Sequence, residues 1–285
     1  MNLHRLIEVL PNWFVFTFVV VNMLGLGMGL SVKEILAPLR DIPPTVKALV
    51  SNFALVPLTA YMILKVLRLE HGLSLGLTLL ACSAGAPFVP KLSETARGDR
   101  AYSLAVMTML SGVTVLYMPI VLPRLLPGVK VDPIAIAKPL IVLILIPLII
   151  GLAVRVRFGK FAGRWAPRLD RLASILVYSA VLLFAVVHYA DIAAAFGSGA
   201  ILAAIVLVVT AFAYGYFLGG SDQRRKGDLA VNTAWRGESA ALAVGLKNFP
   251  GEHNVFTMAL ILVLVSAAVL MPLSATFLRQ RNQAP

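Results

Sequence analysis

The sequence predicts an all-α membrane protein with nine transmembrane helices. Hydrophobic residues make up 59% of the 285 residues, and only 13% are charged. The mean hydropathy is +0.89. Soluble domains carry roughly twice that share of charged residues. A spanning helix needs about 20 apolar residues, so the chain has room for roughly nine or ten such helices and no separate soluble domain.

Nine apolar segments have the length of a spanning helix. They lie at about 12–32, 44–66, 72–97, 101–123, 134–154, 169–190, 197–219, 227–249 and 253–278. Backbone groups in hydrocarbon must be satisfied internally, and these segments lack the alternation of barrel strands, so each is predicted to be helical. The run Trp13–Leu30 is longer than the apolar region of a cleavable signal and is predicted to be the first span.

Basic residues gather in alternate loops of this topology. The ranges 33–47, 97–100, 155–171, 224–226 and 279–281 hold most of the 25 lysines and arginines. Because cytoplasmic loops are enriched in these residues, we predict an outside N-terminus and a cytoplasmic C-terminus, in a plasma membrane of the bacterial inner-membrane type. The net charge of +12 is thus spread over several loops, which argues against a nucleic-acid-binding patch.

The reactive residues do not indicate an enzyme, a metal site or a cofactor. Cys82 is the single cysteine, so it forms no intramolecular disulfide, and no Cys/His cluster is present. The four histidines all lie near predicted helix ends. No Ser/His or paired-Asp arrangement lies at membrane depth, where a hydrolytic site would need it.

Two segments contain stretches that disfavour a continuous helix. The third has small residues and two prolines within 83–91, and each proline removes a main-chain donor and clashes with the preceding turn. The eighth has a central polar stretch over 232–239. The two segments run in opposite directions in the predicted topology. Paired interrupted helices in antiparallel halves indicate an inverted-repeat secondary transporter whose site lies between the breaks.

Short motifs along most of the chain support this interpretation. They are Gly27-Met28-Gly29-Leu30 with Ser31-Val32-Lys33, Asn52-Phe53-Ala54-Leu55-Val56-Pro57-Leu58-Thr59-Ala60, Cys82-Ser83-Ala84-Gly85 with Ala96-Arg97-Gly98-Asp99, and Phe249-Pro250. In this order and spacing they resemble the bile acid:sodium symporter family, in its nine-helix form.

The resemblance implies two domains, a substrate class and a coupling ion. A core domain would hold the crossing of the two broken helices, and a panel domain would move against it. The core would comprise about 44–66, 72–97, 101–123, 197–219, 227–249 and 253–278, and the panel about 12–32, 134–154 and 169–190. The family also implies an organic anion as substrate and two sodium ions near the crossing.

The family's sodium-site pattern is only partly present. Val89-Pro90 stands where the family has Ser-Asn, Asn232 where it has a glutamate, and Arg236-Gly237 where it has Gln-Asn. Asn52 matches a family glutamine, and of two family hydroxyl residues Ser103 is kept while Met107 replaces the other. A hard cation favours several oxygen ligands including a carboxylate. A guanidinium about 4 Å away would repel it by about 4 kcal/mol at an effective dielectric near 20. We therefore expect the sodium site to be lost.

A fixed cation offers an alternative to sodium. Arg236, with Lys91 as a second candidate, would hold the crossing together and attract a carboxylate, which a guanidinium binds bidentately. Glu94 and Glu238 are the candidate counter-charges. A buried carboxylate of this kind would also be able to carry protons, which would give proton coupling in place of sodium coupling.

Each candidate also has a purely structural interpretation. Arg236 would then form an ion pair with Glu238 or Glu94 and never meet substrate, and Lys91 and Glu94 would be interfacial if the third helix ended at Pro90. The amides would bridge helices, and Ser103 would pack between them. The candidate substrate-binding or coupling residues are Arg236, Glu238, Asn232, Thr233, Lys91, Glu94, Asn52 and Ser103.

The leading hypothesis is a secondary transporter that moves a small organic anion by alternating access, without a conventional sodium site. One alternative is a sodium-coupled, bile-acid-type symporter whose ions are held by carbonyls and hydroxyls alone. Another is a non-transporting membrane receptor or sensor on the same fold. The expected partners are the organic anion and the lipid bilayer, with no nucleic acid. A monomer is compatible with the sequence, which specifies no oligomeric state.

Overall fold

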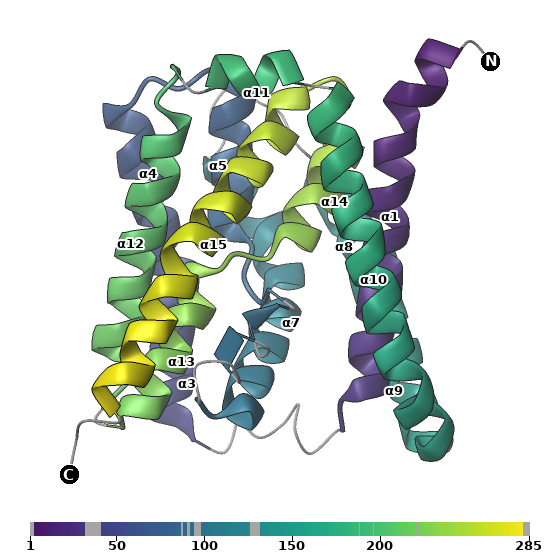
Figure 1. The fold of residues 1–285 in the computed structure, drawn as a ribbon, viewed down its shortest axis with the longest axis vertical. Helices are drawn as coiled ribbons and strands as arrows, with labels where there is room; N and C mark the ends of the chain where they lie inside the picture. Colours follow the sequence, from purple (N-terminus) through teal and green to yellow (C-terminus); the bar gives the residue numbers. More distant parts are fainter. Residues whose placement is uncertain are drawn as a thin grey trace.

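Every regular element in the described part of the chain is helical (Figure 1). The computed structural model describes residues 3–31, 41–86, 88–89, 92–93, 98–125, 132–187, 189–195, 197–220 and 222–281. The helices are α1 (Leu3–Gly29), α3 (Ile42–Val50), η2 (Ser51–Leu55), α4 (Val56–Val66), α5 (His71–Cys82), α7 (Arg100–Leu125), α8 (Pro133–Leu140), η3 (Ile141–Leu145), α9 (Ile146–Arg157), α10 (Gly159–Val187), α11 (Tyr189–Ala195), α12 (Ala200–Leu218), α13 (Gln223–Ala234), α14 (Glu238–Asn248) and α15 (His253–Arg281).

Helices fall within each of the nine predicted segments, and five are long and apolar enough to cross a membrane. These five are Ile42–Val66, Ala101–Leu125, Pro133–Arg157, Ala200–Leu218 and His253–Leu273. Two shorter apolar helices, Trp13–Gly29 and His71–Cys82, accompany them among the described residues. The structure therefore supports an α-helical integral membrane protein, whereas a count of nine spans and the inverted repeat stay predictions.

The basic region 155–171, expected as a loop, is mostly helical in the structure. α9 continues to Arg157, and α10 begins at Gly159 after the single non-helical residue Phe158. Lysine, arginine, alanine and leucine are strong helix formers, so the charged sequence continues the helices instead of ending them. Phe161 and Trp165 on this part of α10 are exposed.

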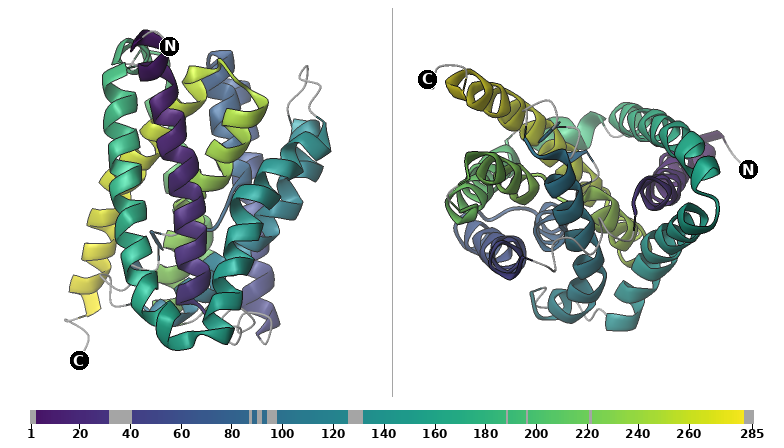
Figure 2. Two further views of the ribbon diagram at one scale, coloured as in Figure 1. Left: turned by 90° about the vertical axis from the view of Figure 1, so that its right-hand side faces the viewer. Right: turned by 90° about the horizontal axis from the view of Figure 1, so that it is seen from below.

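The helices form two groups that meet near the middle of the molecule. α1 packs against α9 and α10, and this group stands at the right of Figure 1 and apart from α12 and α13 in the right-hand view of Figure 2. α12 packs against α4, α13 and α15, and α5 packs against α4, α7 and α15. α8 contacts α7 and α14, so it links the groups. This packing is compatible with the expected panel and core, whose relative motion stays a prediction.

α1 and α9 approach each other through two glycines. A Cβ added to Gly27 would lie 2.3 Å from the Leu148 carbonyl oxygen, and one added to Gly151 would lie 2.4 Å from the Leu24 carbonyl oxygen. Main-chain atoms cannot move aside as a flexible side chain can. Close approach of the two backbones therefore requires glycine at both positions, as small residues do at other membrane helix contacts.

We expect Gly27→Ala to destabilise the protein although alanine is the better helix former. Overpacking against the α9 backbone costs roughly 1–3 kcal/mol, which exceeds the gain of about 1 kcal/mol in helix propensity. Gly29→Ala is the matched control, because its Cβ would meet only Ala166 Cβ at 4.0 Å. The melting temperature in detergent should therefore be lower for Gly27→Ala than for the parent, and equal to or higher than the parent's for Gly29→Ala. Equal melting temperatures for the two variants would show that the α1–α9 contact is not this close.

Two π turns precede prolines and shape the helices around the crossing. The turn Ser51–Leu55 comes just before Pro57, and Ile141–Leu145 comes just before Pro147. A proline has no N–H to continue the α-helical pattern, and a wider turn accommodates that loss. Ser51 and Asn52, in the first turn, are both fully buried. The local sequence thus helps to direct Asn52 toward the interior.

Candidate functional site

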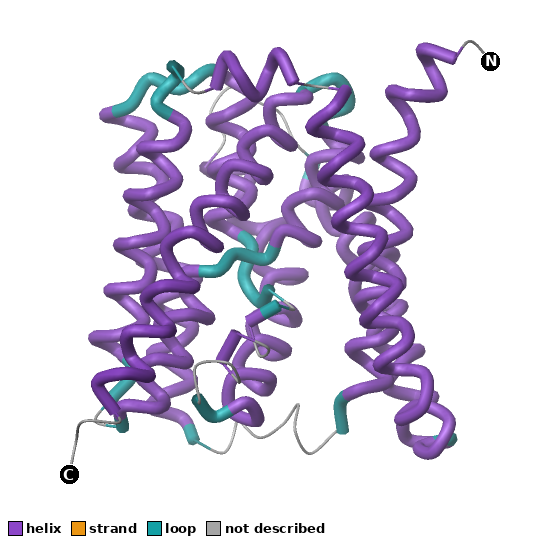
Figure 3. Tube along the Cα trace, in the orientation of Figure 1, coloured by secondary structure: helices purple, strands orange, loops and turns teal. Residues whose placement is uncertain are grey.

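The two interrupted helices cross in the middle of the bundle. α5 ends at Cys82 and α13 ends at Ala234, and the loops that follow them meet at mid-height (teal in Figure 3). The Gly237 main-chain N–H donates to the Ser83 carbonyl oxygen at 3.2 Å. A Cβ on Gly237 would lie 2.7 Å from the Ala84 carbonyl oxygen, so only glycine allows the two backbones to touch there. Both breaks that were predicted from the sequence are therefore present and in contact.

The first break is held by α7. The Ala84 N–H donates to the Thr114 hydroxyl at 3.0 Å, and the Ser111 hydroxyl donates to the Gly85 carbonyl oxygen at 2.9 Å. Gly85 has a φ of +85°, which disfavours residues with a Cβ. A Cβ there would also lie 2.5 Å from the Met107 carbonyl oxygen. These bonds satisfy main-chain groups that the end of α5 leaves without helical partners.

The Arg236 side chain fills the centre of the crossing and is fully buried. Nε donates to the Leu80 carbonyl oxygen at 3.1 Å, and Nη2 donates to the Ala81 carbonyl oxygen at 2.8 Å. Nη1 donates to Asn52 Oδ1 at 2.8 Å and to the Thr233 carbonyl oxygen at 3.0 Å. Nη2 also lies 3.4 Å from the Asn52 carbonyl oxygen. A guanidinium has five N–H donors, and each one here meets a neutral oxygen of the protein.

The acceptors of Arg236 come from the ends of two helices and from the π turn. Leu80 and Ala81 lie in the last turn of α5, and Thr233 lies in the last turn of α13. Carbonyls at these positions lack partners within their own helices, and they sit at the negative ends of the helix dipoles. The guanidinium therefore ties three segments of the chain together through oxygens that would otherwise be unsatisfied in hydrocarbon.

The expected ion pair of Arg236 is not formed with Glu238. Within the described part of the chain no carboxylate oxygen is a hydrogen-bond or ion-pair partner of Arg236, whose acceptors are carbonyl and amide oxygens. Glu238 is the first residue of α14 and is half-buried. Lys91 and Glu94, the other two predicted charges, lie outside the described residues.

The two predicted amides bridge helices at the crossing. Asn52 Nδ2 donates to the Thr233 hydroxyl at 3.2 Å and to the Ala48 carbonyl oxygen at 3.0 Å, and Ser51 Oγ lies 3.3 Å from the same hydroxyl. Asn232 Nδ2 donates to Ser103 Oγ at 2.9 Å. Asn232 Oδ1 is buried, and none of the described residues forms a hydrogen bond with it. The structure thus brings Arg236, Asn52 and Thr233 into one cluster and places Asn232 with Ser103 beside it.

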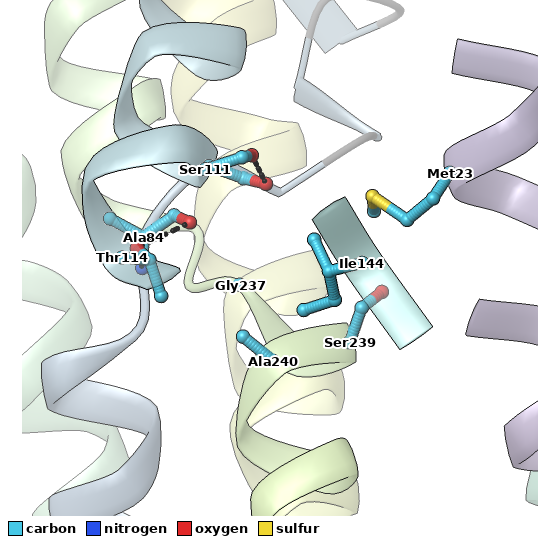
Figure 4. Close-up of a pocket in the computed structure, with 9 residues that line it drawn as sticks. Met23, Ala84, Ser111, Thr114, Ile144, Gly237, Ser239 and Ala240 are labelled. Atoms are coloured by element: carbon cyan, nitrogen blue, oxygen red, sulfur yellow. Dashed lines mark hydrogen bonds between the residues drawn. The ribbon is translucent and has the colours of Figure 1, made fainter. Parts of the chain in front are cut away.

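A small pocket lies beside the crossing (Figure 4). It is lined by Met23, Ala84, Gly85, Ser111, Thr114, Ile144, Gly237, Ser239 and Ala240. Met23 belongs to α1 and Ile144 to η3, so the pocket separates the broken helices from these two elements. Among the described residues the Ser239 hydroxyl has no hydrogen-bond partner, and Ser239 is only 4% exposed.

Several residues of the site were not predicted as functional from the sequence. Ser239 lies within the polar stretch 232–239, and its position three residues after Arg236 was the available signal. Ser111 and Thr114 lie four and seven residues after Met107 in an apolar helix, where hydroxyl residues usually only pack. Ser51 carries no signal apart from its place next to Asn52.

Comparison with known proteins decides the family. The model of the Sodium Bile acid symporter family matches residues 16–195, which is more than half of the chain. The chain belongs to the Sodium Bile acid symporter family. The resemblance predicted from the motifs is therefore confirmed. The matched range includes Asn52 and the first broken helix, whereas Arg236 and the second broken helix lie beyond it.

Relatives of this symporter-family chain are named as transporters. It is 26% identical over 211 residues to the probable sodium/metabolite cotransporter BASS1, chloroplastic, of Arabidopsis thaliana, covering 73% of the chain and 52% of that protein. It is 26% identical over 198 residues to the corresponding BASS2 of Oryza sativa subsp. japonica, covering 69% and 47%. It is 23% identical over 177 residues to the uncharacterized sodium-dependent transporter YocS of Bacillus subtilis (strain 168), covering 59% and 54%. The chain spans about half the length of these relatives.

Proposed function

We propose that this protein is a secondary transporter that moves a small organic anion across a membrane by alternating access around the crossing. The observation that carries the proposal is the pocket between the two breaks on one side and α1 and η3 on the other. A site placed between two helix groups opens to one face or the other when the groups move against each other. Membership of a symporter family and the names of the relatives support the same activity.

The pocket favours a small anion. In this conformation the space among the lining residues is about that of a single water molecule, so a solute enters only after the helix groups move apart, and a small solute needs the least movement. α14 begins beside it, so main-chain N–H groups and the positive end of that helix are near the pocket. The Ser239 hydroxyl adds a free donor in the same place. A small carboxylate fits this combination better than a neutral or cationic solute.

In this proposal Arg236 attracts the substrate through its positive charge and does not form a hydrogen bond with it. All of its donors already meet protein oxygens, so the predicted bidentate contact with substrate would require the crossing to rearrange. A positive charge without a carboxylate partner still makes the local potential favourable to an anion. We therefore propose that Arg236, Asn52 and Thr233 hold the crossing together and give it a positive charge. We assign Glu238, Asn232 and Ser103 to coupling.

The same contacts support transport without sodium. The guanidinium takes the oxygen atoms at the ends of α5 and α13 that a hard cation would otherwise use as ligands. Sodium-coupled transport is the second candidate, because the names of BASS1 and YocS include sodium.

We further propose the predicted orientation, with the N-terminus outside and the C-terminus in the cytoplasm.

Ser239→Ala should separate substrate binding from stability. Removing a buried hydroxyl that has no partner leaves no group unsatisfied, so the melting temperature should stay the same or rise. Small carboxylates that raise the melting temperature of the parent should bind the variant roughly tenfold more weakly, because a hydrogen bond to a charged group is worth about 1.5–3 kcal/mol. The control is Thr257→Val, which removes another buried hydroxyl without a partner, away from the pocket lining.

Uptake into proteoliposomes tests the proposed activity itself. A panel of small carboxylates would be offered under a sodium gradient, a proton gradient or neither, to the parent and to Glu238→Gln. We expect the rate of uptake to be the same with and without the sodium gradient. If transport is coupled to protons, the proton gradient should change the rate of uptake by the parent and leave the rate of Glu238→Gln unchanged. If none of the carboxylates is taken up, or if Ser239→Ala binds them as tightly as the parent, the assigned site is wrong.

A further inference from the structure

A second buried charge, Asp228, lies below the crossing on α13. The residue is 2% exposed, although it carries a carboxylate. The Ser93 hydroxyl donates to its Oδ1, and the Asp99 main-chain N–H donates to its Oδ2 at 2.7 Å. The described residues include no lysine, arginine or histidine paired with it, and Arg225, one turn earlier, pairs with Asp41 instead. Burying a carboxylate is costly unless its oxygens are hydrogen-bonded, and both oxygens of Asp228 accept hydrogen bonds from the described residues.

The chain around Asp228 is closely fitted to the carboxylate. A Cβ on Gly98 would lie 2.0 Å from Asp228 Oδ1 and 2.6 Å from Ser93 Oγ. The Gly98 N–H donates to the Ser93 carbonyl oxygen at 2.8 Å, so the chain closes on itself at this point. Glycine is therefore required for the approach. We call Ser93, Gly98, Asp99 and Asp228 the Asp228 cluster.

The Asp228 cluster joins α13 to the start of α7. The Asp99 carboxylate accepts from the Tyr102 N–H at 3.0 Å, at the first turn of α7. One turn further along both helices, Asn232 Nδ2 donates to Ser103 Oγ at 2.9 Å. Residues four apart lie on the same face of a helix. Hydrogen bonds therefore connect α13 to α7 and its first turn at two positions, one helical turn apart, along one shared face.

α7 is also the helix that holds the first break, through Ser111 and Thr114. α13 leads directly into the second break at Ala234. A slip of α13 along α7 would therefore displace one break relative to the other. The hydrogen bonds of Asp228 are arranged to oppose that slip, because they fix α13 to the chain segment from which α7 begins.

We propose that Asp228 is a positioning residue that sets the register of the two broken helices and so keeps the crossing closed. It acts through Ser93 and the Asp99 main chain, and it need not contact any transported solute. The proposal concerns the geometry of the crossing and does not depend on what the pocket binds. It can therefore be tested without a substrate.

Cys82 supplies a natural probe of the crossing. It is the single cysteine of the chain, it is fully buried, and it ends α5 next to the carbonyls that Arg236 binds. A thiol in this position reacts with N-ethylmaleimide only when the crossing opens locally. The rate of labelling of the intact protein in detergent, measured by mass spectrometry well below the melting temperature, therefore reports how often the crossing opens.

Asp228→Asn should make Cys82 react faster by about tenfold, because the amide presents a donor where an acceptor is needed. Asp99→Asn is the charge control, since it removes an exposed carboxylate yet keeps the main-chain donor and a good helix cap. Val19→Ala on α1 is the stability control, because it shortens a fully buried side chain away from the cluster. Both controls should label within about twofold of the parent.

Ser93→Ala is the second variant, which keeps the carboxylate and removes one of its donors. It should accelerate labelling by about threefold and add nothing further when combined with Asp228→Asn. The proposal is overturned if Asp228→Asn labels Cys82 at the parent's rate, or if Val19→Ala accelerates labelling as much at an equal loss of melting temperature. If Asp228→Asn does not fold, labelling of Ser93→Ala at the parent's rate overturns it.

Discussion

Arg236→Leu should be the most destabilising single substitution at the crossing, lowering the melting temperature in detergent by roughly 10 °C or more. The leucine would leave the carbonyls of Leu80, Ala81 and Thr233 and the Asn52 amide without their donor. Each buried group left unsatisfied costs about 1–3 kcal/mol, and the hydrocarbon around the protein offers no replacement. For a chain of this size, 1 kcal/mol corresponds to about 2 °C.

Arg225→Leu is the matched control for this prediction. Arg225 lies on the adjoining α13 and forms an ion pair with Asp41 at 3.1 Å, but both side chains are about half exposed. An exposed pair of this kind contributes about 0–1 kcal/mol. Arg225→Leu, which loses a salt bridge, should therefore have a melting temperature close to that of the parent. Arg236→Leu, which loses only hydrogen bonds to neutral oxygens, should have a much lower one. Similar melting temperatures for the two variants would refute the structural role of Arg236.

Asn232→Glu combined with Arg236→Gln should give a protein that sodium stabilises. The first change restores a carboxylate at the position where the family has one. The second removes the guanidinium, adds an amide oxygen and frees the carbonyls at the ends of α5 and α13. Several oxygens with one carboxylate are the ligands a hard cation prefers. Melting temperatures in equal concentrations of sodium and potassium chloride should then differ, with sodium the more stabilising.

The single variants show whether both changes are needed. Asn232→Glu alone places a carboxylate on α13, four residues before Arg236 in the chain, where we expect it to pair with the guanidinium and leave sodium without effect. Arg236→Gln alone removes the fixed charge but supplies no counter-charge. If the double variant melts at the same temperature in both salts, the oxygens around Arg236 do not form a latent cation site.

The breaks and the importance of Arg236 could be predicted from the sequence, but its partners could not. Prolines, glycines and a polar stretch inside apolar segments indicate a broken helix directly. Carbonyl groups at helix ends have no side-chain signature, so bonds from Arg236 to Leu80 and Ala81 could not be foreseen. Charge pairing pointed to Glu238 instead, because sequence reasoning considers side chains first.

Asp228 and the pocket were missed for a different reason. Asp228 lies at the start of an apolar segment, where a charge normally indicates the membrane interface and not a buried group. Its burial depends on Ser93 and Gly98, which are more than one hundred residues earlier in the chain. The pocket residues Met23 and Ile144 are ordinary apolar residues until the fold brings them opposite Ser239. Such long-range contacts leave no local pattern.

The central claim is that Arg236 takes the place of a coupling cation, and binding of radioactive sodium to the purified parent protein tests it most directly. The account predicts no saturable sodium binding to the parent, and saturable binding to the double variant Asn232→Glu with Arg236→Gln. Saturable binding to the parent, displaced by unlabelled sodium but not by potassium, would contradict it.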